Sequence, residues 1–352
     1  MNSDSQPPIS LFSLFAAHQH LLRERLHLLL ATLHSDLHAD VVRTLEDSGK
    51  LLFQPDEESN SFPFASSFST WPLLTLLVAQ YTSADIDLEC ASRVAVAVEC
   101  FVCALDLLDD VEDEDQTPIF QAIGTSRVLN VSTALLMLAH QALLSLAHYG
   151  VAPALILRLL ETLQAAALIA TAGQHRDLLA EQRSAQDLTN QECIEIATAK
   201  AGAIMRLAFR LGAMCAGADD KLCDQLSEMG EMLGIAHQLD NDCHDLYHLL
   251  KGETSTILPG EAGNATTQNI KSDLVRGKKT LPIVLAAHIS TPHQITPEST
   301  DEEKKEYLQA LHEGIVTTWG ISLLYRERAR NCLQEIEVQK PFAPALRFLL
   351  GL

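Results

Sequence analysis

Apolar residues recur at three- and four-residue spacing along most of this chain, and this periodicity is what most limits its fold. Leu, Ala and Met follow the spacing through Leu11–Leu45, Leu73–Ala79, Leu88–Leu108, Ser126–His148, Ala152–Leu179, Asn190–Cys215, Lys221–Leu250 and Leu281–His288. Side chains three or four apart share one face of a helix. No sustained run of Val, Ile, Thr and aromatic residues alternates with polar ones, as a strand would. The chain is therefore predicted to be all-α.

Three segments rich in Gly, Pro, Ser, Thr and Asn interrupt the helical pattern, at Glu46–Thr70, Thr254–Ser272 and Ser290–Asp301. The third could mark a domain boundary, but the segment after it is short and again helical. We therefore predict one helical domain over residues 11–352, preceded by a flexible N-terminus of residues 1–10.

The acidic balance excludes one class of partner. The chain carries 46 Asp and Glu against 25 Lys and Arg, a formal charge of −21. Binding to phosphate backbones relies on Lys and Arg, so nucleic acid is not an expected partner. A phosphorylated small molecule remains possible, because carboxylates can hold it through divalent cations.

Sequence features also bear on location. The eight cysteines are scattered without zinc-ligand spacing, which is typical of free thiols in a reducing compartment. The polar start of the chain does not resemble a signal peptide. His, Gln, Arg or Glu interrupt the most apolar stretches before the roughly 20 apolar residues of a membrane span are reached. We expect a cytoplasmic protein that does not span the membrane.

The first candidate site ends an apolar helix. Six carboxylates lie within Asp109–Asp115. At a helix C-terminus they oppose the macrodipole and repel one another, which is unfavourable unless cations relieve it. Asp109 and Asp113 are four apart and share one face, so they can bridge cations together. The alternative is a solvated acidic helix end.

A second acidic cluster weakens that alternative. Asn241 and Asp245 are four apart within another long apolar helix, and Asp242 lies three before Asp245. All these donors are hard oxygen ligands, which suit magnesium rather than zinc. Facing each other, the two clusters would hold several magnesium ions and clamp one diphosphate.

The motifs that carry these residues resemble those of the trans-isoprenyl diphosphate synthases. Five motifs occur in that family's order: Asp109–Asp113 (DDxxD), Gly173–Leu178 (GQxxDL), Ala199–Gly202 (K-T/A-G), Gly234–Asp245 (the second aspartate motif, with Asn241 for one Asp) and Asp273–Pro282 (DLxxGKxTLP). The resemblance covers roughly residues 73–288.

The resemblance implies a class I isoprenoid synthase bundle around a central apolar cavity, and a homodimer. It implies three Mg²⁺ ions that hold an allylic prenyl diphosphate. The metal ligands would be Asp109, Asp110, Asp113, Asn241, Asp242 and Asp245. Diphosphate contacts would come from Lys200, Lys278, Gln174 and Gln238. For diphosphate to leave, its negative charge must be neutralised. The carbocation that remains requires a pocket from which water is excluded.

The sequence departs from the family where elongating members bind isopentenyl diphosphate. Anchored on Pro72, the Lys and Arg of the family's GKxxRP segment become Phe68 and Trp71. Aligned on Glu99, the His of its ExxH segment becomes Val102. The Arg-Arg after DDxxD is absent from Asp113–Pro118.

Two interpretations of these departures stay open. Phe68 and Trp71 could stabilise a carbocation by cation–π attraction, worth roughly 0.5–2 kcal/mol each, or could be ordinary core residues. Alternatively Gly49-Lys50 is the GK segment, with Phe53 where an Arg is sought.

The resulting hypothesis is a terpene synthase or prenyl-transferring relative, similar to a bacterial group that prenylates a tryptophan in a signalling peptide. It would ionise one allylic diphosphate and cyclise it or pass it to an uncharged acceptor. The alternatives are a chain-elongating synthase with a changed second site and a non-catalytic subunit of one. Arg326, Arg328 and Arg330 are expected on a surface helix rather than over the diphosphate.

The helix before Asp109 predicts substrate length. Ala104 and Leu105 should lie below the metals beside the prenyl tail, and Phe101 about one turn deeper would form a floor. Members with short products place an aromatic at the upper pair, so a C15 or C20 substrate is expected.

Overall fold

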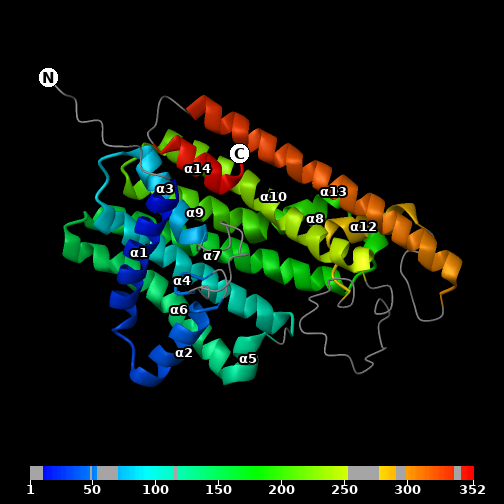
Figure 1. Cartoon of the computed structure of the whole chain (residues 1–352), viewed down its shortest axis with the longest axis horizontal. Coiled ribbons are helices and arrows are strands. Elements are labelled where there is room, and N and C mark those ends of the chain that lie inside the picture. The colour runs from blue at the N-terminus through cyan, green and yellow to red at the C-terminus, as the bar shows by residue number, and fades with distance from the viewer. Residues whose placement is uncertain are drawn as a thin grey trace. The chain divides into compact units, whose positions relative to one another are not determined.

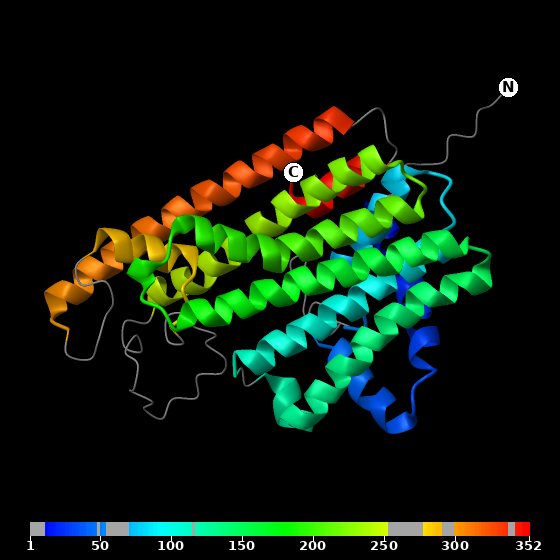
Figure 2. The ribbon, with the colours of Figure 1, turned by 180° about the vertical axis from the view of Figure 1, so that it is seen from behind.

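The computed structural model describes residues 11–47, 50–53, 70–114, 117–252, 277–290, 299–336 and 342–352. In these residues all regular structure is helical, which confirms the all-α prediction (Figures 1 and 2). The helices are α1 (Leu11–Leu30), α2 (Ser35–Leu45), α3 (Thr70–Thr82), α4 (Leu88–Glu112), α5 (Pro118–Ile123), α6 (Thr125–Ser145), η2 (Leu146–Tyr149), α7 (Pro153–Glu181), η3 (Ala185–Asp187), α8 (Asn190–Ala197), η4 (Thr198–Gly202), α9 (Ala203–Cys215), α10 (Asp220–Gly252), α12 (Leu281–Ile289), α13 (Asp301–Ile336) and α14 (Ala343–Leu350).

Three predicted ranges differ from the structure, and one of them, Asn190–Cys215, contains the π-helical turn η4 between α8 and α9. The stretch predicted over Leu11–Leu45 is two helices, because the chain leaves the helix after Leu30 and the Thr32 hydroxyl bonds back to the Leu29 carbonyl at 2.8 Å. Such local side-chain bonds compete with helix continuation without disturbing the apolar spacing. The segment after the third break, expected to be short, contains the 36-residue helix α13.

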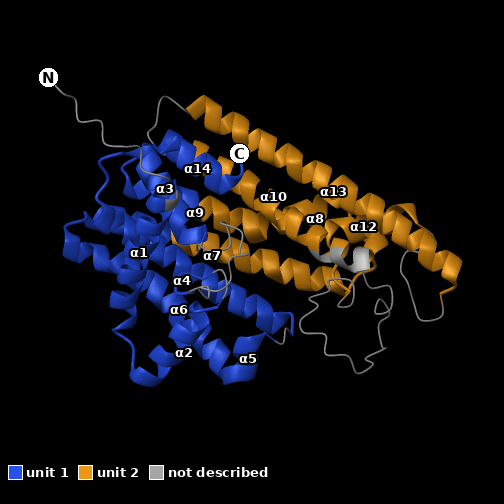
Figure 3. Ribbon diagram, viewed as in Figure 1, with its two compact units in different colours: residues 1–162, 208–224, 337–352 blue, residues 163–207, 225–336 orange. Residues whose placement is uncertain are grey.

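The chain divides into two compact units, which Figure 3 shows in different colours. Unit 1 comprises residues 1–162, 208–224 and 337–352, and unit 2 comprises residues 163–207 and 225–336. That residues 11–352 form one domain stays a prediction, and the N-terminus predicted to be flexible lies outside the described residues.

Helix α4 is the central helix of unit 1. Every residue from Cys90 to Ala104 is buried, and α1, α3 and α6 pack around it. A helix that is apolar on all sides needs such enclosure. Asp87 starts the helix, because its side chain accepts a hydrogen bond from the Glu89 N–H at 2.9 Å. The acidic residues Asp109–Asp113 thus end a helix that the core holds firmly.

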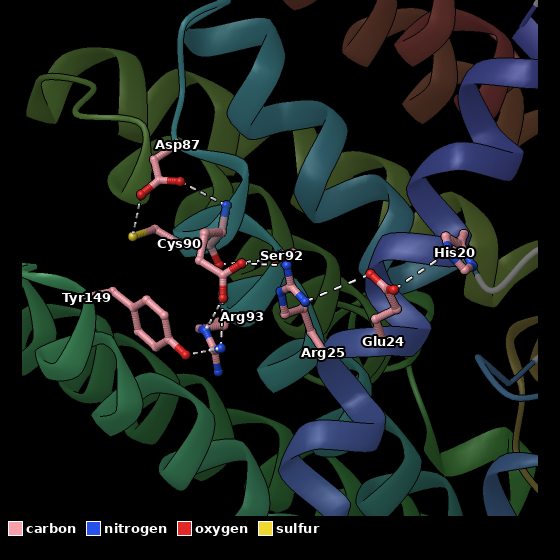
Figure 4. A network of polar contacts seen from close by, with 9 residues as sticks. His20, Glu24, Arg25, Asp87, Cys90, Ser92, Arg93 and Tyr149 are labelled. Atoms are coloured by element: carbon pink, nitrogen blue, oxygen red, sulfur yellow. Dashed lines mark hydrogen bonds and ion pairs between the residues drawn. The ribbon is translucent and has the colours of Figure 1, made fainter.

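A charged network fixes the other end of α4 (Figure 4). Glu89 accepts hydrogen bonds from Arg93 Nε at 2.9 Å and Nη2 at 2.7 Å, and forms an ion pair with Arg25 of α1 at 2.5 Å. The Arg93 guanidinium also lies over the Tyr149 ring, 4.0 Å from its centroid. Arg93 lies about 24 Å along the helix from Asp109, so we interpret this network as structural.

Arg93→Met is expected to lower the free energy of unfolding by about 2–3 kcal/mol, because it removes two hydrogen bonds to Glu89 and leaves that half-buried carboxylate with Arg25 alone. The matched control is Arg158→Met, which breaks the exposed Arg158–Asp220 pair of the same unit at 2.7 Å. That change should cost about 0.5 kcal/mol or less. Urea unfolding measures both, and equal losses would contradict the interpretation.

Unit 2 is built around α10, α12 and α13. Two buried clusters join them: Tyr307, Leu311 and Ile315 of α13 pack with Leu246 and Ile283, and a second contains Leu239, Leu281 and Val284. Gly314 brings α13 onto α12, since a β-carbon there would lie 2.4 Å from the Pro282 carbonyl oxygen.

Two helical segments are long and apolar enough to cross a membrane by length and composition alone. They are Thr125–Tyr149, of which 44% of the apolar window is buried, and Pro153–Glu181, of which 28% is buried. Core helices of globular proteins pass the same test, so these segments are weak evidence. The absence of a membrane span stays a prediction.

Candidate active site

The first acidic cluster begins where the buried part of α4 ends. Leu107 is buried, whereas Asp109, Asp110 and Asp113 are half-buried. The helix stops at Asp113, whose N–H donates to the Asp109 carbonyl at 2.8 Å, and Glu114 follows with a left-handed φ of 56°. The carboxylates therefore occupy the negative end of the helix dipole, as predicted, where a cation is stabilising.

A short strap, residues 50–53, is bound to α1 and to α4 within unit 1. The Leu51 N–H donates to the buried Glu99 carboxylate at 2.7 Å. Arg23 of α1 donates to the Leu51 carbonyl at 2.8 Å and to the Phe53 carbonyl at 2.6 Å. These bonds place the strap beside the helix that ends in the first acidic cluster.

The strap brings Lys50 to the Asp106 carboxylate, three residues before Asp109. Burial alone would lower the pKa of Lys50, but the Asp106 carboxylate raises it above its ordinary value. Lys50 is thus a charged lysine next to the first acidic cluster. This position supports the alternative alignment, in which Gly49-Lys50 is the GK segment.

The residues predicted to replace the second diphosphate site are only partly described. Phe68 lies outside the described residues, and Trp71 is half-buried in the first turn of α3. Val102 is 1% exposed within the apolar middle of α4. No lysine or arginine occurs in the sequence from residue 94 to residue 126.

The residues expected beside the prenyl tail lie on α4. Phe101 and Ala104 are buried, and Leu105 is half-buried. The Ser132 hydroxyl of α6 donates to the Ala104 carbonyl at 2.9 Å, so α6 contacts α4 at this level. That these side chains line a cavity stays a prediction.

The second acidic cluster lies on α10 in unit 2. Gln238 Nε2 donates to Asp242 Oδ1 at 2.9 Å, and Asp242 is buried. Asn241 is exposed, with its amide 3.4 Å from the His237 ring. The Asp245 side chain, predicted to be a metal ligand, lies outside the described part of the structure. Gln238, predicted to bind diphosphate, therefore holds the Asp242 carboxylate in place.

Arg326 is also part of this region. Its guanidinium donates to Asp240 Oδ2 at 2.5 Å, and both side chains are about one-third exposed or less, at 29% and 33%. The expectation of a plain surface arginine is therefore incomplete, because Arg326 joins α13 to the residue before Asn241. Sequence spacing cannot show a contact between residues 86 positions apart.

Lys200 pairs with Asp177, a residue for which the sequence predicted no role. Its ammonium donates to Asp177 Oδ2 of α7 at 2.7 Å, and the two side chains are 15% and 16% exposed. The neighbouring Gln174 has both amide atoms buried without a hydrogen-bond partner in the described part of the chain. An unpartnered buried amide is costly and is typical of a group that bonds a ligand or water.

Lys278 lies in the short segment that leads into α12. Gly277 takes a left-handed φ of 77°, and the Lys279 ammonium donates to the Gly277 carbonyl. The Cys193 thiol donates to the Lys279 carbonyl at 3.6 Å. Burial lowers the pKa of Lys279, which Glu181 partly offsets. Hydrogen bonds from the Lys279 ammonium and the Cys193 thiol therefore fix the turn that carries Lys278.

The thiols near this site are neutral. Burial, with the Asp242 carboxylate nearby, raises the pKa of both Cys193 and Cys243 to about 12. All eight cysteines are free, as the sequence predicted. We assign the thiols no chemistry.

The structure groups the predicted residues by unit. Asp109, Asp110 and Asp113 belong to unit 1, whereas Gln174, Lys200, Gln238, Asp242 and Lys278 belong to unit 2. Within the described side chains, no three His, Cys, Asp or Glu residues lie close enough to hold a metal ion. The oxygen donors suit Mg²⁺, and closure of the two clusters around one diphosphate stays a prediction.

Comparison with known proteins decides the family. The polyprenyl synthetase family matches residues 69–313, well over half of the chain. The chain belongs to the polyprenyl synthetase family. The superfamily predicted from the five motifs is thereby confirmed.

Two relatives of this polyprenyl synthetase family member have different activities in their names. The tryptophan prenyltransferase ComQ of Bacillus spizizenii is 31% identical over 153 residues, 43% of this chain and 50% of that protein. The geranylfarnesyl diphosphate synthase of Aeropyrum pernix is 25% identical over 281 residues, 75% of this chain and 82% of that protein. The chain thus matches only half the length of the first.

Solved structures confirm the fold. The polyprenyl synthetase from Streptomyces coelicolor A3(2) has a TM-score of 0.71 at 22% identity, covering 97% of this chain and 99% of that one. The polyprenyl synthase from Caulobacter crescentus CB15, complexed with calcium and isoprenyl diphosphate, has a TM-score of 0.64 at 21% identity, covering 94% and 96%. At such identities the likeness concerns the fold alone.

Proposed function

We propose that this chain is a magnesium-dependent prenyltransferase or terpene synthase that ionises one allylic prenyl diphosphate. The prenyl cation is then cyclised or passed to an uncharged acceptor. The observation that carries the proposal is Val102: it is buried at the position that aligns with the His of the family's ExxH segment, in a stretch without lysine or arginine from residue 94 to residue 126. A second diphosphate would lack partners there.

The two acidic clusters and the lysines would have different roles in the reaction. Heterolysis of the allylic C–O bond sends both electrons to the diphosphate oxygen and leaves the cation on the prenyl chain. Bound Mg²⁺ would act as the Lewis acid that neutralises the departing group, in line with the calcium bound in one structure of similar fold. Asp109, Asp110 and Asp242 would hold the ions, and Lys200 and Lys278 would bind the diphosphate oxygens.

The cation must then be quenched without water. Loss of a proton after cyclisation, or attack by the π electrons of an acceptor followed by loss of its proton, balances the reaction. The relative named as a tryptophan prenyltransferase makes an indole side chain one acceptor to test. The buried apolar residues of α4 would keep water from the cation.

Chain elongation is the second candidate function. Lys50 favours it, because this lysine lies beside the first acidic cluster as a retained cation. The relative named as a geranylfarnesyl diphosphate synthase also favours it. Against it, the Lys50 ammonium already pairs with Asp106, and the other two cationic elements are missing from the sequence.

One set of incubations separates the candidates. The full chain is incubated with Mg²⁺ and C10, C15, C20 or C25 allylic diphosphate, alone, with isopentenyl diphosphate, or with a tryptophan-containing peptide. Diphosphate release with a hydrocarbon, alcohol or prenylated peptide product supports the proposal. Elongated diphosphates support the second candidate. No turnover in any mixture would favour a non-catalytic subunit.

Substrate length is proposed to be C15 or C20, with the small Ala104 leaving room for the tail and Phe101 closing it. Ala104→Phe should therefore shift turnover from C20 towards C10 diphosphate by about tenfold in their ratio. The ratio is measured within one variant, so that overpacking, which costs about 1–3 kcal/mol, cancels. An unchanged ratio would mean that Ala104 does not contact the tail.

Two further proposals concern the protein as a whole. A homodimer would cover the apolar side chains that the unit 2 part of α7 exposes, Leu168 at 74%, Ile169 at 50% and Leu179 at 48%. Light scattering at micromolar concentration tests it.

The free thiols favour a reducing compartment such as the cytoplasm.

A further inference from the structure

Lys200 lies in an unusual backbone segment. Residues Thr198–Gly202 form η4, a π-helical turn between α8 and α9. Such turns are rare, occur mostly as single turns within α-helices and are frequent at functional sites. Because a π turn breaks the regular helical spacing, α8 and α9 alone do not fix where Lys200 points. The residues of unit 2 that pack against the turn must therefore fix the direction of the Lys200 side chain.

Helix α7 comes close to the first half of this turn at Gly173. A β-carbon built at Gly173 would lie 2.7 Å from Ala199 Cβ, 2.9 Å from the Ala199 carbonyl carbon and 3.0 Å from Lys200 N. Only glycine allows two backbones to approach so closely.

Helix α10 contacts the second half of the turn in the same way. A β-carbon built at Gly234 would lie 2.3 Å from the Ala201 carbonyl oxygen and 2.8 Å from Gly202 Cα. Both contacts are to backbone atoms, which cannot move aside as a flexible side chain can. The π turn η4 therefore packs directly against Gly173 of α7 and Gly234 of α10.

The same helix faces carry polar groups of the candidate site. Asp177 lies four residues after Gly173, so both share one face of α7, and Asp177 pairs with the Lys200 ammonium at 2.7 Å. Gln238 lies four residues after Gly234 on α10 and donates to Asp242 at 2.9 Å. The position of the turn thus also places the Lys200 side chain beside Asp177.

We propose that Gly173 and Gly234 are positioning residues for Lys200. They seat η4 where the Lys200 ammonium can reach a bound diphosphate, and Asp177 holds the ammonium until diphosphate oxygens replace it. The inference rests on the proposed function, because it takes the diphosphate as the ligand of Lys200. A β-carbon at either glycine would displace the turn and the lysine with it.

Binding of inorganic diphosphate with Mg²⁺, measured by calorimetry on the full chain, tests the proposal without turnover. Gly173→Ala and Gly234→Ala should each weaken binding about tenfold or more, as loss of a charge-assisted contact would. Gly202→Ala should weaken it less, since the only atom that a β-carbon there meets below ordinary contact distance is Ile235 Cγ1, at 3.3 Å, while Ala197 O and Glu231 Cγ lie at ordinary distances of 3.5 and 3.6 Å. This milder variant keeps the test available where the other two do not fold.

The controls separate positioning from stability. Gly212→Ala places a β-carbon 2.6 Å from the Thr75 carbonyl oxygen, an equally tight contact in unit 1, so it should lower the melting temperature but leave diphosphate binding unchanged. Gly320→Ala, at an exposed position within α13 with nothing within 4 Å, should leave diphosphate binding unchanged and slightly raise the melting temperature, because alanine is the better helix former. In a Lys200→Met background, the glycine substitutions should cost no further affinity.

Three outcomes would overturn the inference. Folded Gly173→Ala and Gly234→Ala proteins that bind diphosphate like the wild type would do so, with the proposed function left standing. A loss that adds to that of Lys200→Met would show that the glycines affect diphosphate binding independently of Lys200. Absence of diphosphate binding by the wild type would overturn the proposed function and this inference together.

Discussion

Asp109→Ala is expected to abolish release of diphosphate from an allylic substrate while the protein stays folded. The Asp109 carboxylate is half-buried at the negative end of α4, outside the buried span Cys90–Ala104, so its removal does not disturb the core. Loss of a metal ligand should cost roughly 4 kcal/mol or more in the transition state, about a thousandfold in rate. Diphosphate release at saturating Mg²⁺ measures it.

Asp242→Ala should have a similar effect on rate but a different effect on stability. The buried Asp242 carboxylate accepts the Gln238 amide hydrogen bond, and its removal leaves that amide unpaired. An unsatisfied group of this kind costs about 1–3 kcal/mol. Thermal unfolding of both variants should therefore separate the half-buried carboxylate of unit 1 from the buried one of unit 2.

The matched control is Glu114→Ala. Glu114 is exposed, follows the end of α4 and belongs to the same acidic run, so its removal lowers the local charge equally. Turnover should stay within about threefold of the wild type, since general electrostatics at an exposed site contribute little. Near-wild-type turnover of Asp109→Ala would refute the metal assignment.

The sequence predicted the all-α fold and the family correctly, for physical reasons. The all-round apolar character of α4 requires a central position, and the structure has it there. The carboxylates of Asp109–Asp113 lie at the end of that helix because the apolar spacing stops at Leu108. Local patterns of this kind need no knowledge of distant residues.

Contacts between distant residues could not be predicted from the sequence. Lys50 reaches Asp106 across 56 positions, and Arg326 reaches Asp240 across 86. The π turn that carries Lys200 also leaves no signal in the apolar spacing, and the close approach of Gly173 and Gly234 to it joins residues far apart in the sequence. Asp177 could have been found, since it lies four residues after Gly173 within a recognised motif.

Isopentenyl diphosphate is expected not to be condensed by the wild-type chain. The ligand carries about two to three negative charges, and burial without partners costs several kcal/mol, which is several powers of ten in affinity. Val102 offers no charge, and Lys50 is already paired with Asp106. Product analysis by mass spectrometry, with C15 or C20 allylic diphosphate and ordinary concentrations of isopentenyl diphosphate, should find no elongated diphosphate.

Lys50→Met makes this test decisive. Where the proposed function holds, the wild type and Lys50→Met both lack elongated product, because the second site does not bind a diphosphate in either. Elongated product from the wild type that disappears in Lys50→Met would overturn the proposal and identify Lys50 as the retained cation of a working second site. In that case the strap that binds Leu51 to Glu99 and Phe53 to Arg23 would be what presents the lysine to its substrate.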